Sequence, residues 1–135
     1  MDDADYPYTG RKGTCKADPS KYVDMTVTGL TRVSTDENEI KEVLYNTGAL
    51  IAGVNWILLQ TYYGGIIDAS SSECNPSGIN HLVNIVGYGN SNGVDYWICK
   101  NFWGHAWGES GYFRIARGKG TCGINVYVLT GTVSF

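Results

Sequence analysis

The stretch HLVNIVGYGNSNGVDYWICKN, residues 81–101, decides the fold class of this chain. Apolar residues dominate 81–88 and 94–101, and both runs have the length and composition of buried strands. The residues between them, Gly-Asn-Ser-Asn-Gly, are of the types that favour a hairpin turn. We therefore predict a β-hairpin whose first and last residues lie at the same end.

Those end residues are His81 and Asn101. An asparagine amide oxygen that accepts from a histidine fixes the orientation and tautomer of the ring, as a general base requires. Asparagine suits a histidine paired with a thiolate, because the sulfur is then the counter-ion of the imidazolium. A histidine beside a strand is also often purely structural, so the pair alone leaves both interpretations open.

One amphipathic helix is predicted between Asp36 and Gly48. Asp36 is a favourable N-cap residue, and Glu39 completes a capping-box pattern. Gly48 stands where a C-terminal cap belongs. The apolar residues between the caps recur at helical spacing: Ile40, Val43 and Leu44.

Most of the remaining sequence has the hydrophobic pattern of β-strands. Strands are predicted in 22–33, 49–55, 111–117 and 126–130. Residues 56–63 (WILLQTYY) fit a short helix or a continued strand equally well. Segments 5–19 and 68–78 have loop composition. We expect residues 1–135 to form one α+β domain, mainly antiparallel β with one clear helix.

The composition narrows the class of protein. A hydrophobic content of 43% argues against disorder, and no apolar run approaches the roughly 18 residues of a membrane span. A net charge of -3 without a Lys/Arg cluster argues against nucleic-acid binding. No Cys-x-x-Cys or His/Cys cluster indicates a metal, so neither a metal nor a cofactor is expected. The acidic first five residues do not resemble a targeting signal.

Seven short sequence motifs carry a family resemblance. They are YPYTG (6–10), GAL (48–50), YGGI (63–66), NHLVNIVGYG (80–89), YWICKNFWG (96–104), WGESGYFRI (107–115) and CGI (122–124). In this order they resemble the C-terminal, β-rich half of the papain family of cysteine peptidases, cathepsins included. The resemblance implies the barrel-like right-hand domain of the papain-like fold.

The resemblance also implies roles for individual residues. His81 would be the catalytic histidine and Asn101 its orienting partner, while Trp103 and Trp107 would support the site. Shielding by Trp103 would strengthen the histidine–asparagine hydrogen bond. Glu109 and Tyr112 are expected to be scaffold.

A substrate pocket is implied by the same matching. Its residues would be Gly53, Ile79, Asn80, Leu82 and Tyr127. Gly53 leaves space, whereas Leu82 and Tyr127 fill it, and Leu82 stands where the family usually has Ala or Gly. We expect a shallow pocket that selects a small or flat apolar side chain.

Three positions depart from the family pattern or fall outside it. Phe102 replaces the usual Ser and places a bulky ring beside the site. Cys99 takes a strand position usually held by an aliphatic residue, and we expect it to act as a small buried apolar residue. His105 lies where the family has no fixed residue, and it is expected on the solvated surface.

The nucleophile is absent from this sequence. A papain-like peptidase carries it about 130–150 residues before the histidine, in a Cys-Gly-Ser/Ala-Cys-Trp/Tyr motif. No such motif precedes His81, and Cys15 matches a structural cysteine instead. The chain thus corresponds to the His/Asn-bearing half alone, with the Cys-bearing half and its oxyanion glutamine missing. We expect it to be inactive as an enzyme by itself.

The four cysteines allow three disulfide pairings. The resemblance favours Cys74–Cys122, a link of about 4 kcal/mol on the chain-entropy estimate. Cys15 would then lack the partner that the other half supplies. Disulfides indicate an oxidising compartment, and the family implies a lysosome, a vacuole or secretion.

Three functions remain open. The chain is a truncated cysteine peptidase that acts on peptide or protein substrates with a separate N-terminal half, without nucleic acid or membrane. Alternatively it is a non-catalytic pseudo-peptidase that binds a peptide or a protease, or a purely structural β domain. An exposed apolar surface with Phe102, Trp103 and Trp107 would favour the binding module.

Overall fold

The computed structural model describes residue 2 and residues 4–134 of the chain. The strands are β1 (Thr26–Arg32), β2 (Leu50–Val54), β3 (Ile66–Ile67), β4 (His81–Ser91), β5 (Val94–Lys100), β6 (Tyr112–Ala116) and β7 (Val128–Ser134). The helices are α1 (Glu37–Thr47) and the 3-10 helices η1 (Pro19–Lys21), η2 (Trp56–Thr61) and η3 (Thr121–Gly123).

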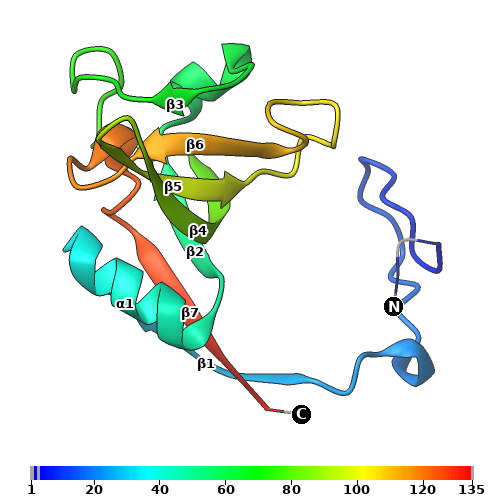
Figure 1. The fold of residues 1–135 in the computed structure, drawn as a ribbon. Helices are drawn as coiled ribbons and strands as arrows, with labels where there is room; N and C mark the ends of the chain where they lie inside the picture. Colours follow the sequence, from blue (N-terminus) through cyan, green and yellow to red (C-terminus); the bar gives the residue numbers. More distant parts are fainter. Residues whose placement is uncertain (1, 3, 135) are drawn as a thin grey trace.

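All seven described strands form one sheet in the order β1-β7-β2-β4-β5-β6-β3. Every neighbouring pair is antiparallel except β3 and β6, which run parallel. The sheet turns from the β1–β7 ribbon at the bottom of Figure 1 to β6 and β3 at the top, and it remains open. The predicted class, mainly antiparallel α+β with one α-helix, is confirmed, and the barrel-like sheet is not closed.

The β4–β5 hairpin has the predicted ends but a tighter turn. The two strands pair from Asn84↔Lys100 to Ser91↔Val94, so only Asn92 and Gly93 form the turn. Both have positive φ angles, 50° and 81°, as a two-residue type I′ turn requires. The five residues predicted as a turn are therefore mostly strand, because Asn-Gly alone satisfies the turn geometry.

The predicted helix is confirmed, although its N-terminal cap differs from the capping box. The Asp36 side chain accepts from the Asn38 N–H at 2.8 Å. The Asp36 N–H donates to Ser34 Oγ at 3.1 Å, so Glu39 is not its partner. Gly48 ends the helix with a φ of 88°. Ile40 and Leu44 are buried against the sheet.

One buried charged residue was not foreseen from the sequence. Glu37 is only 6% exposed, at the first position of α1. It accepts from Trp97 Nε1 and from the Gly120 N–H, both at 2.7 Å. Two strong donors offset the desolvation of this carboxylate, and they join α1, β5 and the loop before η3.

Of two other segments, one follows the first of its two predicted alternatives and one differs from its prediction. Residues 56–63, left open between helix and strand, form η2 up to Thr61. The strand predicted from residue 22 begins only at Thr26, which pairs with Ser134 of β7. Residues 4–25 extend away from the sheet in Figure 1. Within them, Tyr8, Tyr22 and Val23 are exposed.

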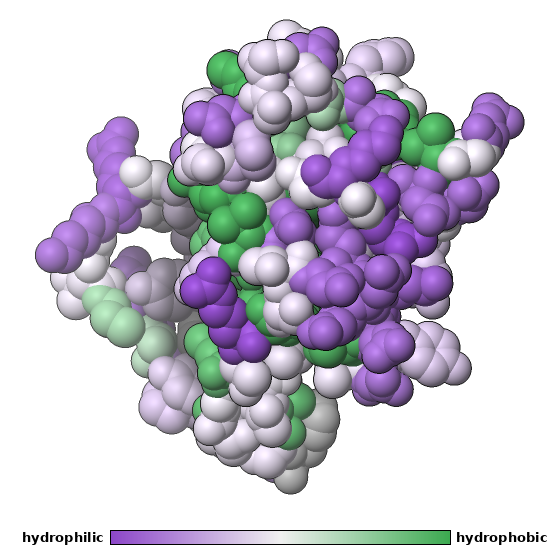
Figure 2. Space-filling model, turned by 90° about the vertical axis from the view of Figure 1, so that its left-hand side faces the viewer, coloured by the Kyte–Doolittle hydropathy of each residue, from purple (hydrophilic) through white to green (hydrophobic). Residues whose placement is uncertain are grey.

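Across the described residues, no helix is both long and apolar enough to cross a membrane. The face shown in Figure 2 is largely hydrophilic and carries only scattered apolar areas.

Candidate active site

The hairpin brings His81 and Asn101 into direct contact. His81 is the first residue of β4, and Asn101 directly follows β5. His81 Nε2 lies 3.0 Å from Asn101 Oδ1, so the predicted juxtaposition of the two side chains is observed. Asn101 is 6% exposed, which removes this hydrogen bond from competing water.

A second hydrogen bond assigns the histidine tautomer. The Phe102 N–H donates to Asn101 Oδ1 at 2.9 Å. Because a backbone N–H can only donate, the atom it faces is the carboxamide oxygen, and His81 Nε2 must therefore carry a proton. In a neutral imidazole this leaves the lone pair on Nδ1. The geometry thus orients Nδ1 of His81 as the basic nitrogen.

Aromatic rings surround the imidazole. Ring centroids of Phe102, Trp103 and Trp56 lie 5.0, 5.1 and 6.4 Å from that of His81. Trp103 packs edge-on against Trp107 at 5.1 Å. Trp107 is held in turn by a 3.1 Å hydrogen bond from Nε1 to the Leu59 carbonyl. The two tryptophans thus form a connected aromatic support beneath the histidine.

A shallow hollow of about 500 Å³ opens beside His81. Its lining consists of Ile79, Asn80, His81, Leu82, Phe102 and Tyr127. Of the residues named from the sequence, only Gly53 is not part of this lining. A Cβ atom there would lie 2.7 Å from Ile79 Cγ2 and 3.3 Å from Tyr127 Cβ. Gly53 therefore lies behind the wall and allows Ile79 and Tyr127 to pack closely.

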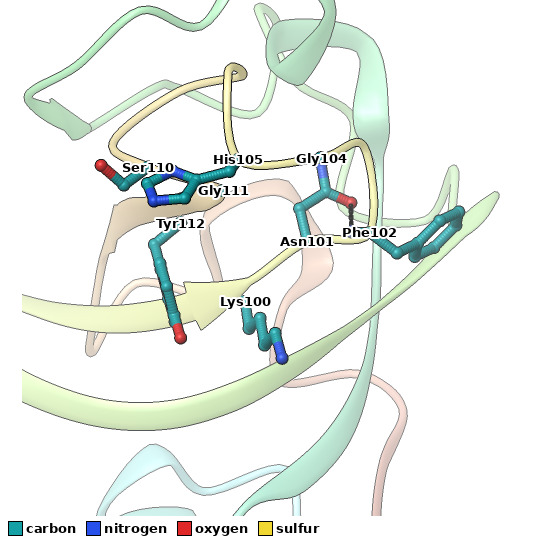
Figure 3. Close-up of a pocket in the computed structure, with 8 residues that line it drawn as sticks. All are labelled: Lys100, Asn101, Phe102, Gly104, His105, Ser110, Gly111 and Tyr112. Carbon is teal, nitrogen blue, oxygen red and sulfur yellow. Dashed lines mark hydrogen bonds between the residues drawn. The ribbon is translucent and has the colours of Figure 1, made fainter. Parts of the chain in front are cut away.

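A second, larger hollow of about 920 Å³ lies at the end of β5. Its lining is Lys100, Asn101, Phe102, Gly104, His105, Ser110, Gly111 and Tyr112, shown in Figure 3. His105 is exposed, as expected, but it borders this hollow together with Lys100. Asn101 Nδ2 is buried and has no hydrogen-bond partner among the described residues. Nothing in the sequence motifs indicated this second hollow.

Glu109 is part of the scaffold around the site. Arg114 donates to it from Nε at 2.9 Å and from a terminal nitrogen at 2.6 Å, and the Gly65 N–H donates at 3.0 Å. The hydrogen bonds from Arg114 hold the pKa of the Glu109 carboxyl below its usual value. These contacts tie the loop before β6 to the segment before β3.

A Glu109→Gln variant is expected to be less stable at pH 7 by about 1 kcal/mol, allowing for the partial exposure of the ion pair. A carboxyl with a lowered folded-state pKa stabilises the fold above its unfolded pKa, and the contribution is lost as the pH falls through the folded pKa. The difference from the parent should therefore shrink below about pH 4.5. Urea unfolding at several pH values measures it, with exposed Glu42→Gln as the control. An unchanged difference at pH 3 would contradict the assignment.

The cysteines separate into one disulfide and two thiols. Cys74 and Cys122 form the predicted disulfide. Cys15 is an exposed free thiol, and Cys99 is a buried one whose pKa is raised by burial. Cys99 thus behaves as the small apolar residue that was expected. No group of three or more metal-binding side chains occurs within the described part of the chain.

The open, mostly antiparallel sheet presents a histidine that is oriented by a buried carboxamide beside an apolar hollow. This arrangement is typical of proteins in which a histidine acts as a general base. The family model described as "Papain family cysteine protease" matches residues 1–132. The chain therefore belongs to the papain family of cysteine proteases.

Its relatives include the cathepsin L-like proteinase of Phaedon cochleariae, 43% identical over 90% of this chain and 37% of the relative. Pro-cathepsin H of Mus musculus is 39% identical over 92% of this chain and 38% of its own length. The chain thus spans little more than a third of these curated relatives.

Two solved protease structures also match this chain over only part of their own length. Digestive procathepsin L 3 from Tenebrio molitor larval midgut superimposes with a TM-score of 0.87 and 38% identity, covering 98% of this chain and 43% of that one. The bromelain protease of Ananas comosus gives a TM-score of 0.82 and 36% identity, covering 96% and 61%.

Proposed function

We propose that this chain is the base-bearing half of a papain-like cysteine peptidase and hydrolyses peptide bonds when a thiol-bearing N-terminal half completes the site. One observation supports this most directly: His81 Nε2 donates to Asn101 Oδ1 at 3.0 Å, which leaves Nδ1 as the base. The proposal assigns catalysis to His81, orientation to Asn101 and support to Trp103 and Trp107.

In the proposed reaction, His81 Nδ1 accepts the proton of the cysteine thiol from the other half. The thiolate attacks the peptide carbonyl carbon and forms a thioester, and the imidazolium protonates the leaving amine. Water then attacks the thioester with His81 again as base, which releases the acid and restores the thiol. The oxyanion donor comes from the other half, so the chain alone lacks two components of the reaction.

The proposed substrate is a peptide or protein that places an apolar side chain in the hollow beside His81. Leu82 and Tyr127 are 52% and 41% exposed and offer apolar surface to it. Gly53 contributes indirectly, through the packing of Ile79 and Tyr127. The disulfide is compatible with an oxidising compartment, and we infer a lysosome, a vacuole or the cell exterior.

The test combines the purified chain with a separately produced N-terminal half from a relative such as the Tenebrio molitor procathepsin. The readout is turnover of a fluorogenic dipeptide arylamide. We expect none from either half and iodoacetamide-sensitive turnover from the mixture. Turnover by the chain alone that iodoacetamide blocks would contradict the assignment of the nucleophile to the other half.

A second candidate is a non-catalytic peptide-binding module. The observation that favours it is the apolar hollow, which the described chain forms by itself. Peptide binding by the chain, with no turnover in the mixture, would support this module instead.

A further inference from the structure

The tip of the β4–β5 hairpin places an asparagine directly before a glycine. Asn92 and Gly93 form the whole two-residue turn, and Asn92 is the one asparagine of the sequence that precedes a glycine. Both residues are exposed. A Cβ atom built on Gly93 would have no atom within 4 Å apart from its chain neighbours. The peptide bond between the two residues is therefore sterically open.

The groups of this turn that can react with each other are both free. Among the described residues, neither the Asn92 carboxamide nor the Gly93 N–H makes a hydrogen bond. Asn90, two positions earlier, differs in this respect, because its Nδ2 donates to Asp95 Oδ1 at 2.8 Å. A carboxamide held by a neighbour is restrained in its rotation, whereas that of Asn92 can turn towards the Gly93 nitrogen.

We propose that Asn92 is a site of spontaneous deamidation. The backbone nitrogen of Gly93 attacks Cγ of Asn92 and forms a C–N bond, and the side-chain nitrogen leaves as ammonia with the proton of the Gly93 N–H. Water then opens the resulting succinimide ring. Addition of water at Cγ gives aspartate, and addition at the backbone carbonyl carbon gives isoaspartate. Gly93 favours the ring closure because it has no side chain to crowd the attacking nitrogen.

The two products differ in their effect on the hairpin. Aspartate keeps the turn, because Asp-Gly suits a type I′ turn as Asn-Gly does. Isoaspartate adds a methylene group to the main chain, so the two residues no longer match the twist of the flanking strands. The strands should therefore open first at the pairs next to the turn, Ser91↔Val94 and Asn90↔Asp95.

Contacts further along the hairpin confine this change to its tip. Arg117 binds Asp95 through a 2.8 Å ion pair and through its own N–H, which donates to the Asp95 carbonyl at 2.9 Å. Beyond this point β5 pairs with β6, and β4 pairs with β2 as far as Val54↔His81. We therefore expect the hydrogen bond between His81 and Asn101 to survive deamidation.

The test incubates the purified chain and follows its intact mass and a peptide map. Loss of ammonia and gain of water raise the mass by about 1 Da. We expect this gain in the peptide that contains residue 92, as two isomers that chromatography separates. The conversion should rise several-fold from about pH 6 to about pH 8, because the attacking amide nitrogen must lose its proton. The variant Asn92→Asp keeps an Asp-Gly turn but has no amide to lose, so it should gain no mass.

The synthetic peptide Ac-Gly-Asn-Ser-Asn-Gly-Val-NH2, which copies residues 89–94, shows the conversion in the absence of the fold. A folded chain that keeps its mass while this peptide converts would overturn the proposal, and so would a mass gain confined to another asparagine. NMR of the converted chain tests the local effect. Changed resonances at residues 90–95 with unchanged ones at His81 and Asn101 support it, whereas changes at His81 would contradict it.

Discussion

Replacing His81 by alanine is expected to lower the peptide turnover of the two-half mixture by about 10³-fold. The imidazole is the group that the geometry orients as a base, with its Nε2 proton donated to Asn101 at 3.0 Å. Without it, neither deprotonation of the thiol nor protonation of the leaving amine has a positioned partner. The apolar hollow keeps its other lining residues, so the loss should appear in kcat more than in KM.

The chain contains a matched control for this variant, because it has two histidines. His105 is exposed and lies outside the His81–Asn101 pair, so His105→Ala should retain most of the turnover. Both variants should be compared with the parent at equal occupancy by the N-terminal half, measured by co-elution. Turnover of His81→Ala similar to that of the parent and above background would remove His81 from the proposed mechanism.

The parts of this site that could be predicted depend on local chemistry. Apolar runs of strand length and an Asn-Gly turn are sufficient to place residues 81 and 101 at one end of a hairpin. The pairing register then brings His81 and Asn101 within hydrogen-bond distance. The helix was equally predictable, because its apolar spacing and both end residues lie within one short segment.

The parts that could not be predicted depend on contacts between distant segments. From the sequence, Glu37 would be expected to be an exposed carboxylate in the first turn of the helix. Its hydrogen-bond partners, Trp97 and Gly120, lie 60 and 83 positions away along the chain. The two-residue strand β3 is too short to carry a periodic pattern, and it exists because β6 lies beside it. Gly53 was matched to the pocket lining, whereas packing of Ile79 and Tyr127 places it behind the wall.

Removing the Cys74–Cys122 disulfide should lower the free energy of unfolding by more than the Glu109→Gln substitution does. Cys74 and Cys122 lie 48 positions apart, and a crosslink over such a loop stabilises a fold by about 4 kcal/mol on the chain-entropy estimate. Domains typically have only about 5–15 kcal/mol of net stability. The double variant Cys74→Ala/Cys122→Ala is therefore expected to unfold at much lower urea concentration than the parent.

The contacts around the disulfide indicate which part should loosen first. Asn55 connects the same two segments, donating from its backbone to the Cys122 carbonyl at 2.9 Å and from its side chain to the Asn75 carbonyl at 3.0 Å. A Cβ atom on Gly123 would lie 2.2 Å from the Pro76 carbonyl oxygen, so the segments are tightly packed there. The segment that contains Pro76 leads directly into Ile79, which forms a wall of the hollow beside His81. Peptide binding should therefore weaken in the double variant even under conditions where most of the chain stays folded.

Urea unfolding followed by tryptophan fluorescence measures the loss, and Cys15→Ser is the control, since that thiol is exposed and unpaired within the described residues. The control should match the parent in stability and in peptide binding. A double variant within about 1 kcal/mol of the parent would mean that Asn55 and the close packing at Gly123 hold the two segments without the crosslink. In that case the hollow should keep its peptide affinity as well, because the same contacts position its wall.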